Sequence, residues 1–303
     1  ETYPLAGLVG NLVVPSEGQG EGESTSTSTT ANNINVIGSQ VTAANNVSLT
    51  AEDEINLQAA QNSQTLSSKN KSSSASVGVS IGLGANGGIT GNVAFNKARG
   101  SANGTDVTWT ETVVQSGNPS TVRQAHSSGQ SGANDKVTLN SGRDTNIIGS
   151  QVIGNQVIAN VGINPTTGEV GTGNLTVQSL QDISTYKEKQ TSSGASISID
   201  LATGIPTGGG VSGSNSKINA NYASVKEQAG IFAGNGGFAV NVNGNTDLKG
   251  AVIASSEQAA ISPKTNSPLP LGEGQGEGNN GKPINSLTTH TLTTSNINNT
   301  AEY

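Results

Sequence analysis

The feature that most constrains this chain is an internal repeat with an offset of 120 residues. Residues 55–65 read INLQAAQNSQT, and residues 175–185 read LTVQSLQDIST. Both copies continue without a gap into residues 72–77 (SSSASV) and 192–197 (SSGASI), so the offset is kept. Similarity at a fixed period is typical of repeat proteins, in which each unit buries its apolar face against its neighbours. The chain is therefore expected to form one long repetitive structure.

A second element occurs three times and sets the length of the unit. It begins at Val36 (VIGSQV), at Ile147 (IIGSQV) and at Leu248 (LKGAVI), with spacings of 111 and 101 residues. The unit is thus about a hundred residues long, which predicts two copies and the start of a third. The expected organisation is a low-complexity linker or insertion at 1–31, repeats at 32–143 and 144–262, a Pro/Gly-rich insertion at 263–283 and the start of a third repeat at 284–303.

Within each unit the apolar residues alternate with polar ones. Val137 and Leu139 show this period of two, as do Phe238, Val240 and Val242. Alternation of this kind indicates half-buried strands, and Asn, Gly and Asp separate the runs where tight turns need them. Strands of four to six residues that recur over hundreds of residues favour a solenoid. We therefore predict an all-β fold, a right-handed parallel β-helix with Val, Ile and Leu inside and Asn, Ser and Thr ladders at the corners.

Each unit also contains a segment of a different kind. Residues 77–83 and 89–95 alternate apolar side chains with Gly, Ser and Asn around a Gly-rich turn, which predicts a protruding β-hairpin with one apolar face. We expect this face to pack on the β-helix, because an exposed apolar stripe promotes aggregation. The alternative is a membrane-active hairpin, although a membrane strand needs about 9–11 residues and this run is shorter unless its flanks contribute.

Low-complexity insertions interrupt the repeat. The sequence EGQGEG occurs identically at 17–22 and at 273–278, near prolines in both places, and residues 163–170 (INPTTGEV) form a shorter insertion. Their glycine content and like charges predict flexible loops that leave the solenoid at the edge of one rung.

Composition excludes several classes of protein. The net charge of -7 over 303 residues is small, which argues against disorder despite the low apolar content of 31%. Without cysteine the chain has no disulfide or thiol chemistry. Its 14 basic residues are scattered along the sequence, with only Lys69/Lys71 and Lys187/Lys189 close together, so we expect no nucleic-acid partner. The chain begins without Met or an export leader, which predicts a fragment or a processed piece.

Three glycine-rich motifs resemble nucleotide-binding loops without their context. Residues 82–87 and 208–213 match G-x-G-x-x-G, but strands or polar turns follow where a dinucleotide site needs a helix. Residues 276–282 have the spacing of a P-loop, but Pro283 stands where a Ser or Thr would ligate magnesium. We interpret the first two as hairpin turns and the third as a linker, so no cofactor is expected.

No group of side chains marks a catalytic or metal site. His126 and His290 lie in different repeats without partners at zinc-ligand spacing, and the Asp53/Glu54 pair is typical of a solvated rim. Trp109, the only tryptophan, is either an exposed contact residue or a packed strand residue. We therefore predict a protein that is not an enzyme. A polysaccharide lyase on the same scaffold would need a cluster of charged residues on one strand face.

Three stretches carry a resemblance to a known family. Residues 144–152 (DTNIIGSQV), 174–179 (NLTVQS) and 250–255 (GAVIAS) resemble the haemagglutinin repeats of filamentous haemagglutinin-type exoproteins. Such repeats occur in two-partner-secretion adhesins and in CdiA-like effectors of contact-dependent growth inhibition. The similarity covers residues 32–262, and residues 286–303 resemble the start of the next repeat.

This resemblance implies a secreted filament on the surface of a Gram-negative bacterium, exported through an outer-membrane transporter of the two-partner type. It implies adhesion or toxin delivery to other bacteria as the function, with the target-cell surface and adjacent repeats of the same chain as partners. The three insertions depart from the family pattern. The alternative reading that stays open is a membrane-active hairpin module that forms an outer-membrane conduit.

Overall fold

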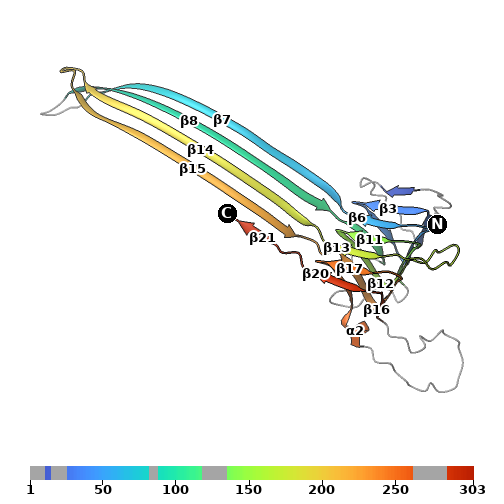
Figure 1. Cartoon of the computed structure of the whole chain (residues 1–303). Helices are drawn as coiled ribbons and strands as arrows, with labels where there is room; N and C mark the ends of the chain where they lie inside the picture. Colours follow the sequence, from blue (N-terminus) through green and yellow to red (C-terminus); the bar gives the residue numbers. More distant parts are fainter. Residues whose placement is uncertain (1–10, 15–25, 82–87, 118–134, 262–284) are drawn as a thin grey trace, which may run out of the picture. The chain divides into compact units, whose positions relative to one another are not determined.

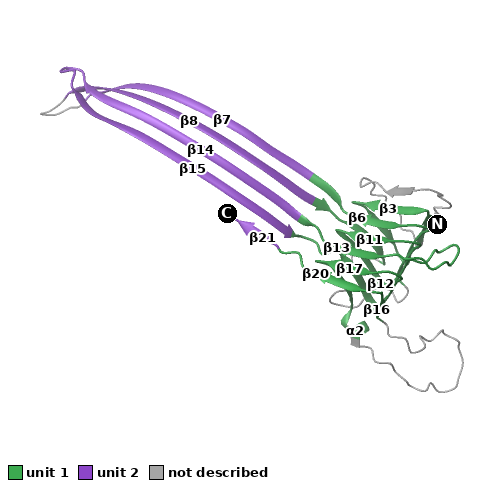
Figure 2. Cartoon of the chain, viewed as in Figure 1, with its two compact units in different colours: residues 1–62, 109–181, 225–298 green, residues 63–108, 182–224, 299–303 purple. Residues whose placement is uncertain are grey.

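The computed structural model describes residues 11–14, 26–81, 88–117, 135–261 and 285–303. In this part of the chain the strands form three sheets, and the one helix is the five-residue α2 (Glu257–Ile261). The chain divides into two compact units, which are coloured separately in Figure 2. Unit 1 comprises residues 1–62, 109–181 and 225–298, and unit 2 comprises residues 63–108, 182–224 and 299–303.

Unit 1 contains two sheets whose strands pair in parallel (Figure 1). The seven-stranded sheet has the order β1 (Asn11–Val14), β3 (Asn33–Ile37), β6 (Ile55–Gln58), β11 (Thr145–Ile148), β13 (Leu175–Gln178), β17 (Thr246–Lys249), β20 (Leu292–Ser295). The nine-stranded sheet has the order β18 (Val252–Ser255), β16 (Gly230–Val242), β12 (Ser150–Val161), β10 (Lys136–Ser141), β5 (Asn46–Ala51), β2 (Ser26–Ala31). Its three other strands are β19 (Ser286–Thr288), which pairs with β16, β9 (Thr112–Ser116), which pairs with β12, and β4 (Gln40–Ala43), which pairs with β9. The chain passes back and forth between these sheets, with β4 and β5, β9 and β10, and β18 and β19 as consecutive strands of the nine-stranded sheet. This is the winding of a parallel β-solenoid. This arrangement confirms the predicted all-β fold.

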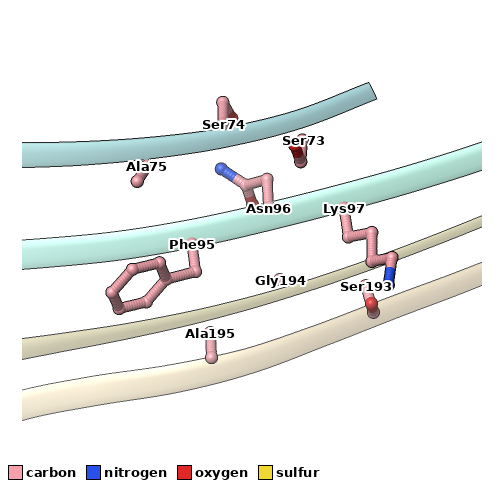
Figure 3. A pocket seen from close by; sticks show the side chains of 9 residues that line it. All are labelled: Ser73, Ser74, Ala75, Phe95, Asn96, Lys97, Ser193, Gly194 and Ala195. Atoms are coloured by element: carbon pink, nitrogen blue, oxygen red, sulfur yellow. The ribbon is translucent and has the colours of Figure 1, made fainter. Parts of the chain in front are cut away.

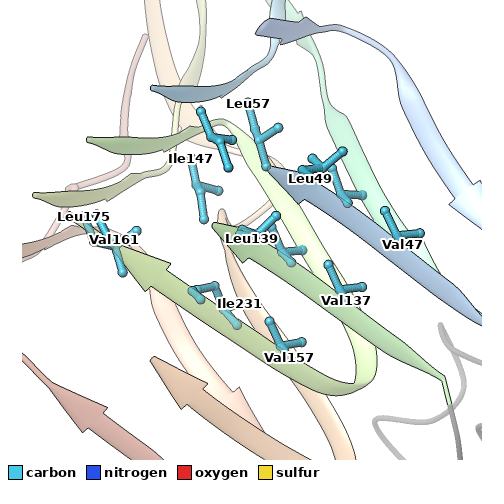
Figure 4. Packing of buried hydrophobic residues seen from close by; sticks show 14 of the residues in the cluster. Val47, Leu49, Leu57, Val137, Leu139, Ile147, Val157, Val161, Leu175 and Ile231 are labelled. Atoms are coloured by element: carbon cyan, nitrogen blue, oxygen red, sulfur yellow. The ribbon is translucent and has the colours of Figure 1, made fainter. Parts of the chain in front are cut away.

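Columns of apolar side chains fill the interior of the solenoid. In the nine-stranded sheet Leu49 pairs with Leu139, Leu139 pairs with Ala159, and Ala159 pairs with Val240, so four buried side chains stack in one column. The seven-stranded sheet supplies a facing column made of Val36, Leu57, Ile147 and Val177. Figure 4 shows Leu49 and Leu139 on neighbouring strands with Leu57 and Ile147 opposite them. The alternation read from the sequence therefore places its apolar members in this core.

Glycine forms the corner between the two sheets in each occurrence of the second repeated element. Gly38, Gly149 and Gly250 have φ angles of 55°, 59° and 57°. Each follows a strand of the seven-stranded sheet and precedes a strand of the nine-stranded sheet. Left-handed backbone of this kind costs other residues roughly 1–2 kcal/mol, which explains why this element contains glycine at the same place three times.

Unit 2 is a separate antiparallel sheet made from the two hairpins. Its order is β21 (Thr300–Glu302), β15 (Pro206–Val225), β14 (Gln181–Asp200), β8 (Ile89–Thr110), β7 (Ala60–Ile81). The strands of the first hairpin have 22 residues each, and those of the second have 20. They are far longer than the predicted runs at 77–83 and 89–95. The flanking Ser, Thr, Asn and Gly residues carry no apolar alternation, yet their backbones continue the pairing.

Candidate functional site

Two asparagine ladders run along the outside of the solenoid. Asn56 donates to Asn35 (3.0 Å), and Asn146 donates to Asn56 (2.8 Å), across three parallel strands of one sheet. The other sheet has the same arrangement, in which Asn160 donates to Asn140 (2.9 Å) and Asn241 donates to Asn160 (3.0 Å). An amide has both a donor and an acceptor, so identical residues in register can bond to the rung above and the rung below. The ladders fix the register. The sequence predicted such ladders at the corners of the rungs, whereas these asparagines lie within the strands.

The sheet of unit 2 has a continuous register between its two hairpins. Pairing between β14 and β8 begins at Ile183 with Val107 and ends at Asp200 with Thr90, without a shift. Side chains of paired residues lie on the same face of a sheet, and successive residues of a strand lie on opposite faces. All the odd-numbered residues of β8 and β14 therefore share one face, which also carries the sole tryptophan of the chain, Trp109 of β8.

The two outer strands of this sheet keep the same parity. The Ser67 hydroxyl lies 3.2 Å from the Asn103 amide oxygen, which places odd residues of β7 beside odd residues of β8. The Ser192 and Ser214 hydroxyls are 2.7 Å apart, which places even residues of β15 beside even residues of β14. The face made of odd-numbered residues in β7, β8, β14 and β15 is called the odd face below.

The turn end of the odd face carries large apolar side chains. This apolar patch consists of Val77, Val79, Ile81, Ile89, Val93, Phe95, Ile197, Ile199 and Val211. Val77 is 78% exposed and Val211 is 89% exposed. On the opposite face, the even-numbered residues next to these positions are only Gly, Ala, Ser, Thr, Asn and Asp. The strands of unit 2 therefore leave this apolar face on the surface of their own sheet.

Half of the basic residues of the chain lie next to the apolar patch. Seven of the 14 lysines and arginines occupy odd positions in the middle of the four strands. This cationic band consists of Lys69, Lys71, Lys97, Arg99, Lys187, Lys189 and Lys217. All seven side chains are exposed. The strand register therefore brings together on one face basic residues that are far apart in the sequence. This corrects the interpretation that the positive charge is scattered without forming a cluster.

The carboxylates of the same four strands lie on the opposite face. Asp106, Asp182, Glu188 and Asp200 are all at even positions. On β21, Glu302 pairs with Asn221, so this one carboxylate falls on the odd face. The two faces of the sheet therefore differ in charge: the lysines and arginines of the four strands lie on the odd face, and their carboxylates lie on the even face.

The patch and the band meet at an open depression on the odd face. Its lining residues are Ser73, Ser74, Ala75, Phe95, Asn96, Lys97, Ser193, Gly194 and Ala195. Figure 3 shows the Phe95 ring and the Lys97 side chain leaving β8 on the same side, while Asn96 leaves it on the other. An apolar ring and an ammonium group are therefore available side by side to one ligand surface.

Asp200 caps the turn of the second hairpin. Its carboxylate accepts the backbone N–H groups of Ala202 (2.8 Å) and Thr203 (2.9 Å). The bonds from Thr203 and then Ala202 lower the pKa of the Asp200 carboxyl, because they favour its charged form. Gly204, with a φ of 70°, completes the turn, and its N–H donates to the Asp200 carbonyl (2.8 Å).

We expect this turn to loosen in acid. A carboxyl with a lowered pKa stabilises the fold above the pKa of the unfolded chain, and this contribution is lost as the pH falls through the folded value. Hydrogen exchange at the Ala202 and Thr203 amides should therefore speed up as the pH falls into the carboxyl range, after correction for intrinsic rates. Asp200→Ala should remove this pH dependence, and Asp200→Asn should retain partial protection. Unchanged protection in Asp200→Ala would contradict the capping role.

On the same even face, the Tyr186 hydroxyl donates to the Glu188 carboxylate (2.8 Å). This bond raises the pKa of Tyr186, because the phenol loses its partner when it ionises. The pair occupies alternate positions of one exposed strand, so it stabilises local side-chain order.

The residues considered from the sequence do not converge. The Trp109 indole N–H donates to the Gln181 carbonyl (3.0 Å), which supports the packing role. Asp53 forms an ion pair with Arg143 of a neighbouring rung (3.2 Å), as expected for a solvated rim, and His290 is exposed. Residues 208–213 lie within β15, so the interpretation of this motif as a hairpin turn is wrong. His126 and the motifs at 82–87 and 276–282 lie outside the described residues.

Within the described ranges no three His, Asp or Glu side chains lie close enough together to hold a metal ion. In the same ranges, no helix has the length and apolar character that crossing a membrane requires. Sequence reasoning had missed the cationic band, because its members are 2 to 148 residues apart in the chain. One sequence feature did point to it: Lys69 and Lys71, like Lys187 and Lys189, are two residues apart, and side chains at this spacing lie on the same face of a strand.

The repeated rungs agree with the result of a comparison with family models. The model described as "Hemagglutinin repeat" matches residues 14–193 and 173–264. The chain belongs to the haemagglutinin repeat family. This finding confirms the resemblance noted in the sequence. No solved structure matches the chain.

Relatives from several bacteria are similar over most of the chain. It is 35% identical over 272 residues to "Deoxyribonuclease CdiA" of Dickeya dadantii (strain 3937), which covers 89% of the chain and 7% of that protein. It is 40% identical over 222 residues to "tRNA nuclease CdiA" of Escherichia coli (strain STEC_O31), which covers 73% of the chain and 6% of that protein. "Toxin CdiA" of Escherichia coli is 34% identical over 271 residues, which covers 88% of the chain and 7% of that protein. The chain therefore corresponds to a small part of these relatives.

Proposed function

We propose that the chain is a structural repeat segment of a secreted surface exoprotein of a Gram-negative bacterium, and that it serves contact-dependent inhibition of other bacteria. The observation that carries this proposal is the haemagglutinin repeat match, together with 34–40% identity to three CdiA proteins. The names of these relatives include nuclease activities, which belong to those whole proteins. Because the matched region is only 6–7% of their length, the proposal assigns no reaction to this segment.

The solenoid is suited to extending a chain over distance. Each rung advances the structure by about 4.8 Å, and its backbone bonds join it only to the rungs before and after it. The core columns and the asparagine ladders repeat on successive rungs, so the same contacts can be formed one rung at a time. A segment of this kind can fold progressively after export, and we assign it an outer-membrane transporter of the two-partner type as its export partner.

The proposed organisation along the chain follows the repeats. We assign the first repeat to residues 32–143, the second to 144–262 and the start of a third to 284–303, with insertions at 1–31 and 263–283. The pairing of β20 with β17, and of β21 with β15, supports further growth of both kinds of sheet by adjacent repeats of the same polypeptide.

A chimera tests this proposal. Residues 14–264 of this chain would replace the matching region of the Dickeya dadantii relative, and the chimera would be expressed with its own transporter. We expect surface display, and inhibition of susceptible neighbours within about tenfold of the parent. A chimera that is displayed at the parental level but inhibits no neighbour would contradict the proposed role. The same chimera with Leu139→Asp is the control, because it should fail at folding and display rather than at delivery.

A further inference from the structure

The two faces of the unit 2 sheet differ in side-chain size as well as in charge. The odd face carries the apolar patch and, beside it, the cationic band, whose side chains are long. The even face is made of small side chains over much of the same length. At the even positions of 70–80, 92–100, 192–198 and 208–216 the residues are only Gly, Ala, Ser and Asn. Layers of side chains pack best when large residues on one layer meet small residues on the other.

The rest of the even face carries groups that attract cations. Asp106 lies on β8 and Glu188 lies on β14, where it pairs with Ala102, four residues before Asp106. Tyr186 and Tyr222 are on the same face, and Tyr222 is 45% exposed. Carboxylates attract Lys and Arg by charge, and the face of an aromatic ring attracts them through its quadrupole. Within the four long strands, no lysine or arginine occupies an even position.

The groups of the two faces follow the same order along the strands. In the register of β8, the patch spans residues 89–95 and the cationic band spans residues 97–103, where Asn103 pairs with Lys187. On the even face the small residues come first, and the carboxylates follow at residues 102–106. A shift of about four residues, roughly 14 Å, therefore places the band of one sheet over the carboxylates of another. The same shift places the patch over the small residues.

Other occupants of the odd face satisfy only part of it. An identical odd face would cover the apolar patch, but it would bring seven cations against seven others. A polar polyanion would neutralise the cationic band and leave the patch in water. The even face of a second copy supplies both the carboxylates and a flat seat for the patch.

The contact area is sufficient for a specific interface. Four strands spaced about 4.8 Å apart, overlapping over about 16 residues of about 3.4 Å each, cover roughly 1,000 Å² on each sheet. The total of about 2,000 Å² reaches the upper end of the range for standard protein–protein interfaces. The sheet is also regular, because β8 and β14 pair without a shift in register. Stacked sheets lie about 10 Å apart, which the large side chains of one face and the small ones of the other can fill.

We propose that the unit 2 sheets of two copies of this chain stack face to back, with the odd face of one copy on the even face of the next. The two faces of such a contact are different, so each added copy leaves one odd face and one even face free. Association of this kind is open-ended rather than limited to a dimer. This inference does not rest on the proposed function, because it follows from the faces of unit 2 alone.

Analytical ultracentrifugation of the purified chain tests the inference. We expect the average mass to rise with concentration in low salt without a plateau at the dimer, and the association to weaken at high salt. Lys97→Glu/Arg99→Glu should weaken it about a hundredfold, because like charges then face each other. Asp106→Lys/Glu188→Lys should do the same from the other face. A chain that stays monomeric at submillimolar concentration in low salt would overturn the proposal.

A mixture of the two charge-reversed variants is the decisive arm. Each variant alone places like charges on both of its faces, whereas the reversed face of one is complementary to the reversed face of the other. The equimolar mixture should therefore associate within about tenfold of the parent chain. Circular dichroism of each variant should match the parent, which separates lost contact from lost folding. If the mixture stays as weakly associated as its components, the two faces do not meet and the proposal is wrong.

Two further variants separate this contact from net charge and from simple polyanion binding. Lys226→Glu/Lys249→Glu changes the charge by the same amount at exposed positions outside the cationic band, and should associate within about threefold of the parent. Val79→Ser/Ile81→Ser keeps the charge and should weaken association at least about tenfold, because two exposed apolar side chains lose their cover. Equal losses in the two charge-changed pairs would overturn the proposal. So would a chain that binds soluble polyphosphate but does not self-associate.

Discussion

Replacing Gly149 with valine should lower the free energy of unfolding of the solenoid by roughly 2–5 kcal/mol. Gly149 has a φ of 59°, a conformation that a β-branched residue adopts only with strain. A Cβ at this position would also lie 2.7 Å from Leu180 Cδ1 and 2.9 Å from the Ala59 Cβ, which is closer than carbon atoms approach. Backbone strain and steric overlap therefore act together at this corner.

The damage should be local at first, because the rungs contact only their neighbours. The Gly149 N–H donates to the Gln178 carbonyl (2.7 Å), and the Ala59 N–H donates to the Ile148 carbonyl (2.9 Å), so the corner joins three successive rungs. Hydrogen exchange at these amides, measured with urea-induced unfolding, should show lost protection before the distant rungs respond.

Two control variants divide the effect into its parts. Gly168 has a φ of 72° but open space around its Cβ position, so Gly168→Val should show the cost of strain alone, about 1–2 kcal/mol. Gly78 has neither a positive φ nor a neighbour within 4 Å, so Gly78→Val should be nearly neutral. A Gly149→Val chain as stable as Gly78→Val would show that the corner does not need glycine.

The corner glycines show how far the sequence determined the fold. The threefold recurrence of the element at Val36, Ile147 and Leu248 predicted a structural unit, and the unit is a turn between two strands in each case. The sequence could not reveal the sign of φ, because glycine is also frequent in loops and in the hairpins. Only the path from one sheet to the other requires a left-handed residue at these positions.

Buried polar residues mark a second limit of the sequence pattern. Thr145 is fully buried in a core column between Ile55 and Leu175, where alternation predicts an apolar residue. Its hydroxyl lies 2.8 Å from the buried Ser141 hydroxyl, so each satisfies the other. The pair forms because the corner at residues 142–144 brings the end of β10 beside the start of β11, and a period of two does not encode the path of that corner.

The candidate surface was harder to predict for the same reason. The apolar runs around Val77 and Val93 were visible as strands, but the sequence did not show that their own sheet leaves them exposed. Whether a face is covered depends on what lies opposite it, and the long Ser- and Gly-rich flanks that extend the hairpins carry no hydrophobic signal. The grouping of Lys97, Lys189 and Lys217 required the register between the strands, which a single sequence does not contain.

The interior of the solenoid should be most sensitive at Leu139. We expect Leu139→Ala to cost about 3–5 kcal/mol, near the upper part of the range for such changes. Leu139 is fully buried in the column between Leu49 on one rung and Ala159 on the next. Ala159 is too small to fill the space that the leucine leaves, and the parallel strands cannot move closer without breaking their hydrogen bonds. The cavity should therefore persist.

The neighbouring position provides a matched control on the same strand. Thr138 pairs with the same two strands but lies on the outer side of β10, half-buried. Thr138→Ala should change the free energy of unfolding by less than about 1 kcal/mol. Equal losses at the two positions would show that backbone pairing, rather than the packed column, provides the stability.

A compensating variant tests the column itself. In Leu139→Ala/Ala159→Leu the total volume is kept, and the larger side chain moves one rung along the same column. If the interior is a continuous stack, the double variant should recover a substantial part of the loss in urea unfolding, with a coupling energy of about 1–2 kcal/mol. Each site would remain beside a partner that was already in contact with it, namely Leu49 for residue 139 and Val240 for residue 159. If the two substitutions instead add their separate costs, each rung packs independently, and the stability of the solenoid comes from single rungs rather than from the stacked core.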